Sequence, residues 1–318
     1  MKHEGHKGNE GHKGKTRKGS TVVSSLSFVL STPAALIGLA IMVLSEAATL
    51  AQIEPFWSWN TPIAWTGFIL FADAIVFRAR GDSWIRSSPR EFSALALASI
   101  PLWVVFELYN VVIRNWYYTG LPVNWWLRHF GYAWSFATIS PAIFEGAALV
   151  AVLRAGQAER AGQDVPAHPA PPAHPALSIA TGALMLASPF VASPAVAQYL
   201  AAPVWLGFIF LLDPINAHLG AESIAVDLAR GRRDRLINLI LSGCLCGALW
   251  ELWNYWSRAK WHYTVPIMGH MKIFEMPAPG YLGFTAFALE CFTMYVFVRA
   301  VWVRLAGAPP DSGRPIGC

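Results

Sequence analysis

The chain has 318 residues, of which 55% are hydrophobic and only 14% are charged, whereas a soluble globular domain carries about 25% charged residues. Its apolar residues come in blocks of roughly 20, a length that spans a bilayer as a helix, so the composition excludes an ordinary soluble domain. The net charge of +5 would suit nucleic acid, but the positions of the charges explain it otherwise.

The chain begins with a polar segment rich in Gly, Lys and His, in which Glu-Gly-His-Lys-Gly occurs at 4–8 and again at 10–14. Low-complexity sequence of this kind does not bury a core. We expect residues 1–25 to form a disordered basic tail near anionic lipid head groups. This interpretation is favoured over a weak metal site at His3, His6 and His12.

Eight apolar blocks follow the tail, and each predicts a transmembrane helix. They lie at about 26–50, 61–78, 92–113, 131–153, 177–199, 203–219, 235–257 and 281–303. The sixth contains Asp213-Pro214, which predicts a kink or a break. The fold class is therefore all-α and polytopic.

Two membrane units of four helices each are predicted, at 26–153 and 177–304. A proline-rich stretch at 154–176 reads as an extended linker between them, and 305–318 is a C-terminal tail. The units match in sequence: residues 65–73 match 205–213 at an offset of 140, 106–110 match 250–254 at 144, and 116–119 match 261–264 at 145. An even number of helices per unit predicts a twofold axis along the membrane normal.

The basic residues predict the orientation. With the N-terminus in the cytoplasm, 19 of the 24 Lys and Arg residues lie on the cytoplasmic side, as the positive-inside rule requires. We therefore expect a multi-pass protein of the inner (cytoplasmic) membrane with both termini cytoplasmic. Topology alone explains the basic charge, and no nucleic-acid partner is expected.

Six acidic residues lie inside the apolar blocks at matched places. They are Asp73, Glu107 and Glu145 in the first unit and Asp213, Glu251 and Glu290 in the second. A charge at the bilayer centre costs about 2.5–3.5 kcal/mol or more. Because the spans hold almost no Lys or Arg, we expect several of these acids to be protonated or to face a wet cavity.

Spacing indicates which of these acids share a site. Asn110 and Asn254 follow Glu107 and Glu251 at i+3 and so share a helix face with them. Glu145 and Glu290 lie near mid-depth on the next helix of each unit, so one predicted site per unit lies in the outer half of the membrane. The predicted catalytic residues are Glu107, Asn110, Glu145, Glu251, Asn254 and Glu290. We also expect helices three and seven, which carry Glu107 and Glu251, to be central.

Aromatic residues are dense at the same level. They are either an interfacial belt or a slot for a lipid-like ligand whose positive charge would rest on π faces. The candidate binding residues are Trp116, Tyr118, Trp261, Tyr263, Asp73 and Asp213. A metal at Asp213, His218 and Glu222 is disfavoured, because no His pair at i,i+4 accompanies them, and no cofactor is expected.

Two segments resemble a known family. One is Trp116-Tyr-Tyr-Thr-Gly-Leu-Pro122 followed by Pro141-Ala-Ile-Phe-Glu145; the other is Trp261-His-Tyr-Thr-Val-Pro266 followed by a proline entry at Pro279 to the helix bearing Glu290. This pattern, over about 60–118 and 203–295, resembles the duplicated membrane carotenoid cyclases (the heterodimeric or fused lycopene cyclases) and the related hydratases. The resemblance implies an all-helical, acid-dependent protein acting on a long polyene.

The pattern also departs from that family. The family has paired glutamates after its proline, whereas Glu145 is followed by Gly146 and Glu290 by Cys291. The first and fifth helices are additional to a three-helix unit.

Three classes of function fit these features. The first is an enzyme that moves protons on a lipid or isoprenoid. The second is a proton-coupled transporter or channel, and the third is a structural subunit whose polar residues hold helices together. The expected partner in the first case is a membrane lipid or a hydrophobic small molecule, and an oligomer is compatible with all three.

Overall fold

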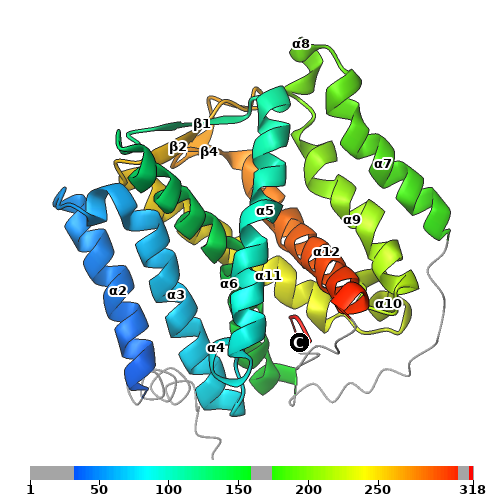
Figure 1. Ribbon diagram of the computed structural model, residues 1–318, viewed down its shortest axis with the longest axis horizontal. Coiled ribbons are helices and arrows are strands. Elements are labelled where there is room, and N and C mark those ends of the chain that lie inside the picture. The colour runs from blue at the N-terminus through cyan, green and yellow to red at the C-terminus, as the bar shows by residue number, and fades with distance from the viewer. Residues whose placement is uncertain (1–31, 159–173, 307–314, 318) are drawn as a thin grey trace, which may run out of the picture.

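The computed structural model describes residues 32–158, 174–306 and 315–317, and these are mostly helical (Figure 1). The predicted tail at 1–25, with its histidines, lies outside the described residues, as do most of the linker and of the C-terminal tail. The long helices are α2 (Pro33–Leu50), α3 (Phe56–Arg80), α5 (Pro89–Ile113), α6 (Trp125–Ala158), α7 (Pro175–Val191), α9 (Ala201–His218), α11 (Asp234–Trp256) and α12 (Tyr281–Ala306). Three single-turn or two-turn helices join them: α4 (Trp84–Ser87), α8 (Pro194–Ala197) and α10 (Ile224–Ala229).

Each predicted span corresponds to one of these long helices, and six of them are long and apolar enough to cross a membrane. The six are α2, α3, α5, α6, α11 and α12. The helix predicted at 177–199 ends at Val191, because Ser193-Pro194 starts the separate helix α8 and proline cannot continue the hydrogen-bond ladder. The composition and the helices together indicate a helical membrane protein.

The predicted break at Pro214 is not observed. Helix α9 runs through Pro214 from Ala201 to His218. The kink lies instead in α3, where Trp59 has non-helical angles (φ −123°, ψ 25°) three residues before Pro62. Proline removes the hydrogen bond to the residue four positions earlier, here Ser58, so the distortion falls one turn before the ring.

The outermost helices pack on their neighbours through paired glycines. A Cβ added to Gly38 of α2 would lie 2.6 Å from the Gly67 carbonyl oxygen of α3, and one added to Gly182 of α7 would lie 2.7 Å from the Gly207 carbonyl of α9. Small residues let helix backbones approach in this way in a membrane. Figure 1 shows the two pairs, α2 with α3 and α7 with α9, at opposite edges of the bundle.

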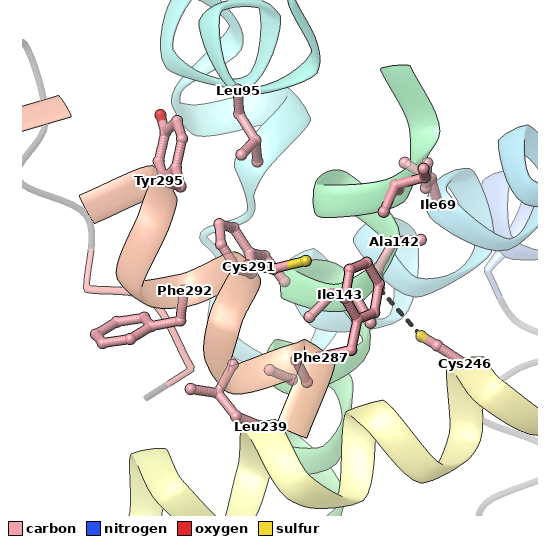
Figure 2. Packing of buried hydrophobic residues seen from close by; sticks show 14 of the residues in the cluster. Ile69, Leu95, Ala142, Ile143, Leu239, Cys246, Phe287, Cys291, Phe292 and Tyr295 are labelled. Atoms are coloured by element: carbon pink, nitrogen blue, oxygen red, sulfur yellow. Dashed lines mark hydrogen bonds between the residues drawn. The ribbon is translucent and has the colours of Figure 1, made fainter. Parts of the chain in front are cut away.

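The centre of the bundle is α6 rather than α5. In the apolar stretch of α6, 78% of the residues are buried, against 50% in α11 and 22% in α5. The Ser242 hydroxyl of α11 donates to the Ile143 carbonyl of α6 at 2.7 Å, and the neighbouring Cys246 thiol points to the Ala142 carbonyl (Figure 2). The expectation that helix three is central is therefore wrong: α5 can lie near the edge because Glu107 is only partly buried and its charge is met by the side chains of Trp103, Trp116 and Tyr118.

Two short antiparallel ribbons were not predicted. Strand β1 (Trp116–Thr119) pairs with β2 (Lys260–Tyr263), and β3 (Lys272–Ile273) pairs with β4 (Met276–Pro277); a 3₁₀ turn, η1 (Ala278–Gly280), then leads into α12. In the first ribbon Trp116 faces Tyr263 and Tyr118 faces Trp261. The β1–β2 ribbon follows the C-terminal ends of α5 and α11, so it caps one end of the bundle.

A network of ion pairs closes the other end. Arg299 of α12 pairs with Glu91 of α5 at 2.9 Å and with Glu222, and Arg235 of α11 pairs with Glu222 at 2.6 Å and with Asp227. Residues near the C-terminus join this network: the Ile316 N–H donates to Glu222, and Arg235 donates to the Ile316 carbonyl. These contacts satisfy the charges at this end of the helices.

Candidate functional site

A cavity of about 580 Å³ lies beneath the β1–β2 ribbon, and helices from both predicted units enclose it. This volume falls in the range of small-molecule sites, about 300–1,000 Å³. Its aromatic lining comprises Trp59, Trp65, Trp103, Trp116, Tyr118, Tyr132, Phe136, Trp205, Trp250, Trp261, Tyr263, Phe284 and Phe287. All four aromatic residues predicted as binding candidates are in this list.

In the first unit, one carboxylate oxygen gathers three donors. Oε1 of Glu107 accepts from the Trp103 indole at 2.8 Å, from the Trp116 indole at 3.3 Å and from the Tyr118 hydroxyl at 2.5 Å. Hydrogen bonds to an ionised oxygen are the strong ones. The geometry therefore stabilises negative charge on Glu107 and separates it from the cavity by a layer of aromatic rings.

In the second unit, the corresponding carboxyl is reached through a single tyrosine. Glu251 is 0% exposed, and its Oε1 accepts from the Tyr263 hydroxyl at 3.0 Å. The Trp261 indole donates to that same hydroxyl at 2.9 Å, and the second carboxyl oxygen of Glu251 has no hydrogen-bond partner among the described residues. Tyr263 lines the cavity and Glu251 does not, so the hydroxyl is the link between the carboxyl and the cavity.

The two tyrosines are fixed hydrogen-bond donors at the cavity wall. Burial raises the pKa of Tyr118 well above its ordinary value, and the charge of Glu107 raises it further. Burial raises the pKa of Tyr263 in the same way, and its hydrogen bond to Glu251 raises it further. Both hydroxyls therefore hold their protons at neutral pH. They lie on one face of the ribbon at diagonal positions, where Cα atoms are about 7–8 Å apart.

Asn110 and Asn254 hold the ribbon in place. The Asn110 side chain donates to the Trp116 carbonyl at 2.8 Å and accepts from the Trp116 N–H at 3.2 Å. Asn254 makes the same two contacts with Trp261, both at 2.9 Å. These predicted site residues are thus brought to Glu107 and Glu251 as expected, but they contact the strand backbone and position the aromatic side chains.

Glu145 and Glu290 do not line the cavity. Both are fully buried. The last lining residue of α6 is Ile139, six positions before Glu145, or about 9 Å at 1.5 Å per residue. Glu290 lies three positions beyond Phe287, the last lining residue of α12, and neither of its carboxyl oxygens has a hydrogen-bond partner among the described residues. None of the six predicted catalytic residues therefore lines the cavity. Glu107, Asn110, Glu251 and Asn254 lie behind the lining residues to which they are hydrogen-bonded, whereas Glu145 and Glu290 lie in the helix core.

Comparison with known proteins found no match, whether with protein-family models, with curated sequences or with solved structures.

Asp73 and Asp213 lie near the opposite end of the bundle and hold short helices there. Asp73 accepts from the Ile85 N–H at 2.9 Å, at the start of α4. Asp213 accepts from the Ile224 N–H at 2.7 Å and the Ala225 N–H at 2.9 Å, at the start of α10. Carboxylates are stabilised at helix N-termini, which explains why both units have one here. Neither residue lines the cavity.

No group of three or more His, Cys, Asp and Glu side chains within residues 32–158, 174–306 and 315–317 is arranged to hold a metal ion. Of the three metal candidates considered in the sequence, Glu222 pairs with two arginines and Asp213 with backbone N–H groups.

The sequence did not single out the tryptophans that bring the two units together at the cavity. Trp65 of α3 contacts Trp250 and Trp253 of α11, with ring centroids 5.7 and 4.8 Å apart. Reciprocally, Trp205 of α9 stacks on Phe106 of α5 at 5.0 Å. Trp65 and Trp205 are at matched positions of the repeat, and that match was the signal that could have identified them.

Proposed function

We propose that this protein is a membrane enzyme that transfers protons to and from the unsaturated chain of an isoprenoid-like lipid. The observation that carries the proposal is the pair of tyrosine hydroxyls, Tyr118 and Tyr263, that line an aromatic cavity while each is hydrogen-bonded to a carboxyl group behind it. A hydroxyl backed by a carboxyl is a unit of general acid–base catalysis. An aromatic wall suits both a long apolar chain and the positive charge that protonation of an alkene creates.

The two units differ in a way that assigns them different roles. Glu251 is fully buried and one of its two oxygens has no hydrogen-bond partner among the described residues, so we assign it the proton and the role of general acid. Glu107 receives three hydrogen bonds on one oxygen, so we assign it the charge and the role of general base. Glu145 and Glu290 lie away from the cavity and take no part in this step.

The proposed reaction balances without an oxidant or a cofactor. Tyr263 gives its proton to an alkene carbon while Glu251 gives its own to the tyrosine oxygen, so that a carbocation forms beside the tryptophan faces. A neighbouring C–H of the carbocation then loses a proton to Tyr118, whose own proton passes to Glu107. The net change is movement of a double bond along the chain; if a second double bond of the chain attacks the carbocation before the proton is lost, its π electrons form the new C–C bond and the net change is ring closure. Solvent returns the proton from Glu107 to Glu251.

We also propose that all eight long helices cross the bilayer, with the β1–β2 ribbon at the outer face of the inner membrane and both termini in the cytoplasm. The support for this orientation is that it puts 19 of the 24 basic residues on the cytoplasmic side. It also includes the tandem repeat. With an offset of 145, the pair Trp116–Tyr263 becomes Trp261–Tyr118, which is the other pair of the same ribbon. A twofold axis that passes between Tyr117 and His262 would exchange these two pairs in the same way.

The resemblance to membrane carotenoid cyclases is part of the same proposal. Tyr118 and Tyr263 are the tyrosines of the two Trp-x-Tyr segments on which the resemblance depends. A polyene is the kind of long, unsaturated chain that an aromatic cavity and paired proton donors would serve.

Mass spectrometry of lipid that co-purifies in mild detergent tests the ligand class. We expect a bound isoprenoid or polyene in the wild type and its loss in Gly131→Phe. Gly131 lines the cavity, and a Cβ there meets only the Trp59 indole at 3.9 Å, so the new ring fills the cavity. Bulk phospholipid alone in the wild type would contradict the proposal and favour a transporter or a structural subunit.

A further inference from the structure

One basic side chain at the cavity has no counter-ion. Arg128 lies in the first turn of α6, is partly buried and lines the cavity. Its Nε donates to the Pro122 carbonyl at 3.0 Å, which fixes the plane of the guanidinium group. Its two terminal amino groups have no hydrogen-bond or ion-pair partner among the described residues.

The other basic residue of the lining is neutralised. Lys260 Nζ lies 3.0 Å from Glu275 Oε1 and donates to the Tyr255 carbonyl at 3.1 Å, while His262 approaches the second oxygen of Glu275 at 3.1 Å. Among the described lining residues there is no Asp or Glu. The cavity therefore has one uncompensated positive charge, and that charge is on Arg128.

The position of Arg128 matches the depth of a lipid head group. Trp125 and Trp126, in the same helical turn, are 56% and 75% exposed, as expected of residues at a membrane–water interface. Leu127 and Leu282 line the cavity and are also exposed, at 48% and 74%. An apolar chain could therefore pass from the bilayer into the aromatic interior while its head stays beside Arg128.

We infer that the ligand of this cavity is an amphiphile, an isoprenoid chain with a phosphate-type anionic head group that binds Arg128. A guanidinium group with two free amino groups binds a phosphate through two parallel hydrogen bonds. The inference rests on the proposed lipid site, but not on the proposed proton transfer. Glu107, the proposed base, does not line the cavity and is covered by Tyr118, whose hydroxyl donates to it.

The inference is tested by titrating the protein in zwitterionic nanodiscs and following the fluorescence of the tryptophans that line the cavity. The probes are a polyprenyl monophosphate, the polyprenol of equal chain length, and inorganic phosphate. We expect the monophosphate to bind about tenfold more tightly than the alcohol, on the scale of one charge-assisted hydrogen bond. Inorganic phosphate should neither bind nor compete at the same concentration.

Arg128→Gln should remove the preference for the phosphate and leave the affinity for the alcohol unchanged, and Arg128→Lys should keep part of the preference. Arg114→Gln is the matched control, because Arg114 is exposed, lies outside the cavity lining and is also on the predicted outer side. Equal affinities of the wild type for the phosphate and the alcohol, or a preference that survives in Arg128→Gln, would overturn the inference. Tight binding of inorganic phosphate would do so too.

Failure of this inference and failure of the proposed function give different results. If the monophosphate binds through Arg128 but no proton exchange occurs, the proposed chemistry is wrong and the head-group site stands. If the wild type exchanges protons with an isoprenoid chain but binds the monophosphate and the alcohol equally, the head-group site is wrong and the chemistry stands.

Discussion

Replacing each of the two glutamates behind the cavity tyrosines by glutamine should have different effects: Glu251→Gln should lose more activity, and Glu107→Gln should lose more stability. Glu251→Gln keeps the shape and the oxygen that accepts from Tyr263, but removes the proton that the proposed acid donates. We expect activity to fall about 10²-fold or more, on the scale of a lost general acid, with little change in stability. In Glu107→Gln, the same oxygen would still face three donors, but its charge would be gone.

The stability effect of Glu107→Gln follows from those three bonds. A hydrogen bond to a charged group contributes about 1.5–3 kcal/mol and a neutral one about 0.5–1.5 kcal/mol. Neutralising the acceptor should therefore lower the free energy of unfolding by about 1–3 kcal/mol, because the weakened bonds belong to one network and do not add fully. We expect a smaller loss of activity than in Glu251→Gln.

Both variants can be compared in the same detergent, by thermal unfolding for stability and by conversion of the co-purified isoprenoid for activity. The division of roles predicts that Glu107→Gln is the less stable and Glu251→Gln the less active. If Glu107→Gln is the less active of the two, the assignment of acid and base is reversed. If both are active and stable, the glutamates are only satisfied polar groups of a helix bundle.

Three further predictions test other parts of the structure. In a background without native cysteines, a membrane-impermeant thiol reagent should label Val123→Cys and Met268→Cys from outside but not Gly81→Cys or Arg233→Cys; the reverse pattern would overturn the orientation. Gly38→Leu should part α2 from α3 and lower the melting temperature, since its Cβ alone would lie 2.6 Å from the Gly67 carbonyl, whereas Gly283→Ala, with nothing within 4 Å, should be neutral. Burial alone would raise the pKa of Glu275, but Lys260 and His262 outweigh it and lower the pKa below 4.5. The stabilising contribution of the Glu275 carboxylate is therefore present above pH 4.5 and is lost as the pH falls through the folded-state pKa. Glu275→Gln should flatten the decline of stability at acid pH, and an unchanged decline would show that this ion pair does not contribute to stability.

The sequence predicts the helices well because a bilayer leaves a chain few alternatives. Long apolar blocks must satisfy their own backbone, so each predicted span is a helix in the structure. Their ends were predicted less well where proline intervened, as at Pro194 after α7. The paired glycines that hold α2 and α7 were also unrecognised, because a glycine in an apolar block says nothing about which neighbour it faces.

The site was only half predictable for a related reason. A helix in lipid is apolar on every side, so hydrophobic periodicity does not say which face points inward. Glu107 and Glu251 were identified as buried acids, but the spacing could not show that Glu145 and Glu290 lie away from the cavity. The partners Tyr118 and Tyr263 belong to strands of four residues. The sequence shows that the two Trp-x-Tyr segments match, but it does not show that they pair as the β1–β2 ribbon over the cavity, because the paired residues are about 145 positions apart.

Exchange of solvent hydrogen into the bound isoprenoid is the most direct measurement of the central claim. The purified protein with its co-purified lipid would be incubated in D₂O, and the lipid analysed by mass spectrometry. The proposed proton transfer predicts incorporation of deuterium at a carbon of the chain, about 10²-fold slower in Glu251→Gln and slowed also in Tyr263→Phe, which lacks the hydroxyl between Glu251 and the cavity. An isoprenoid that stays bound and acquires no deuterium in the wild type would contradict the claim.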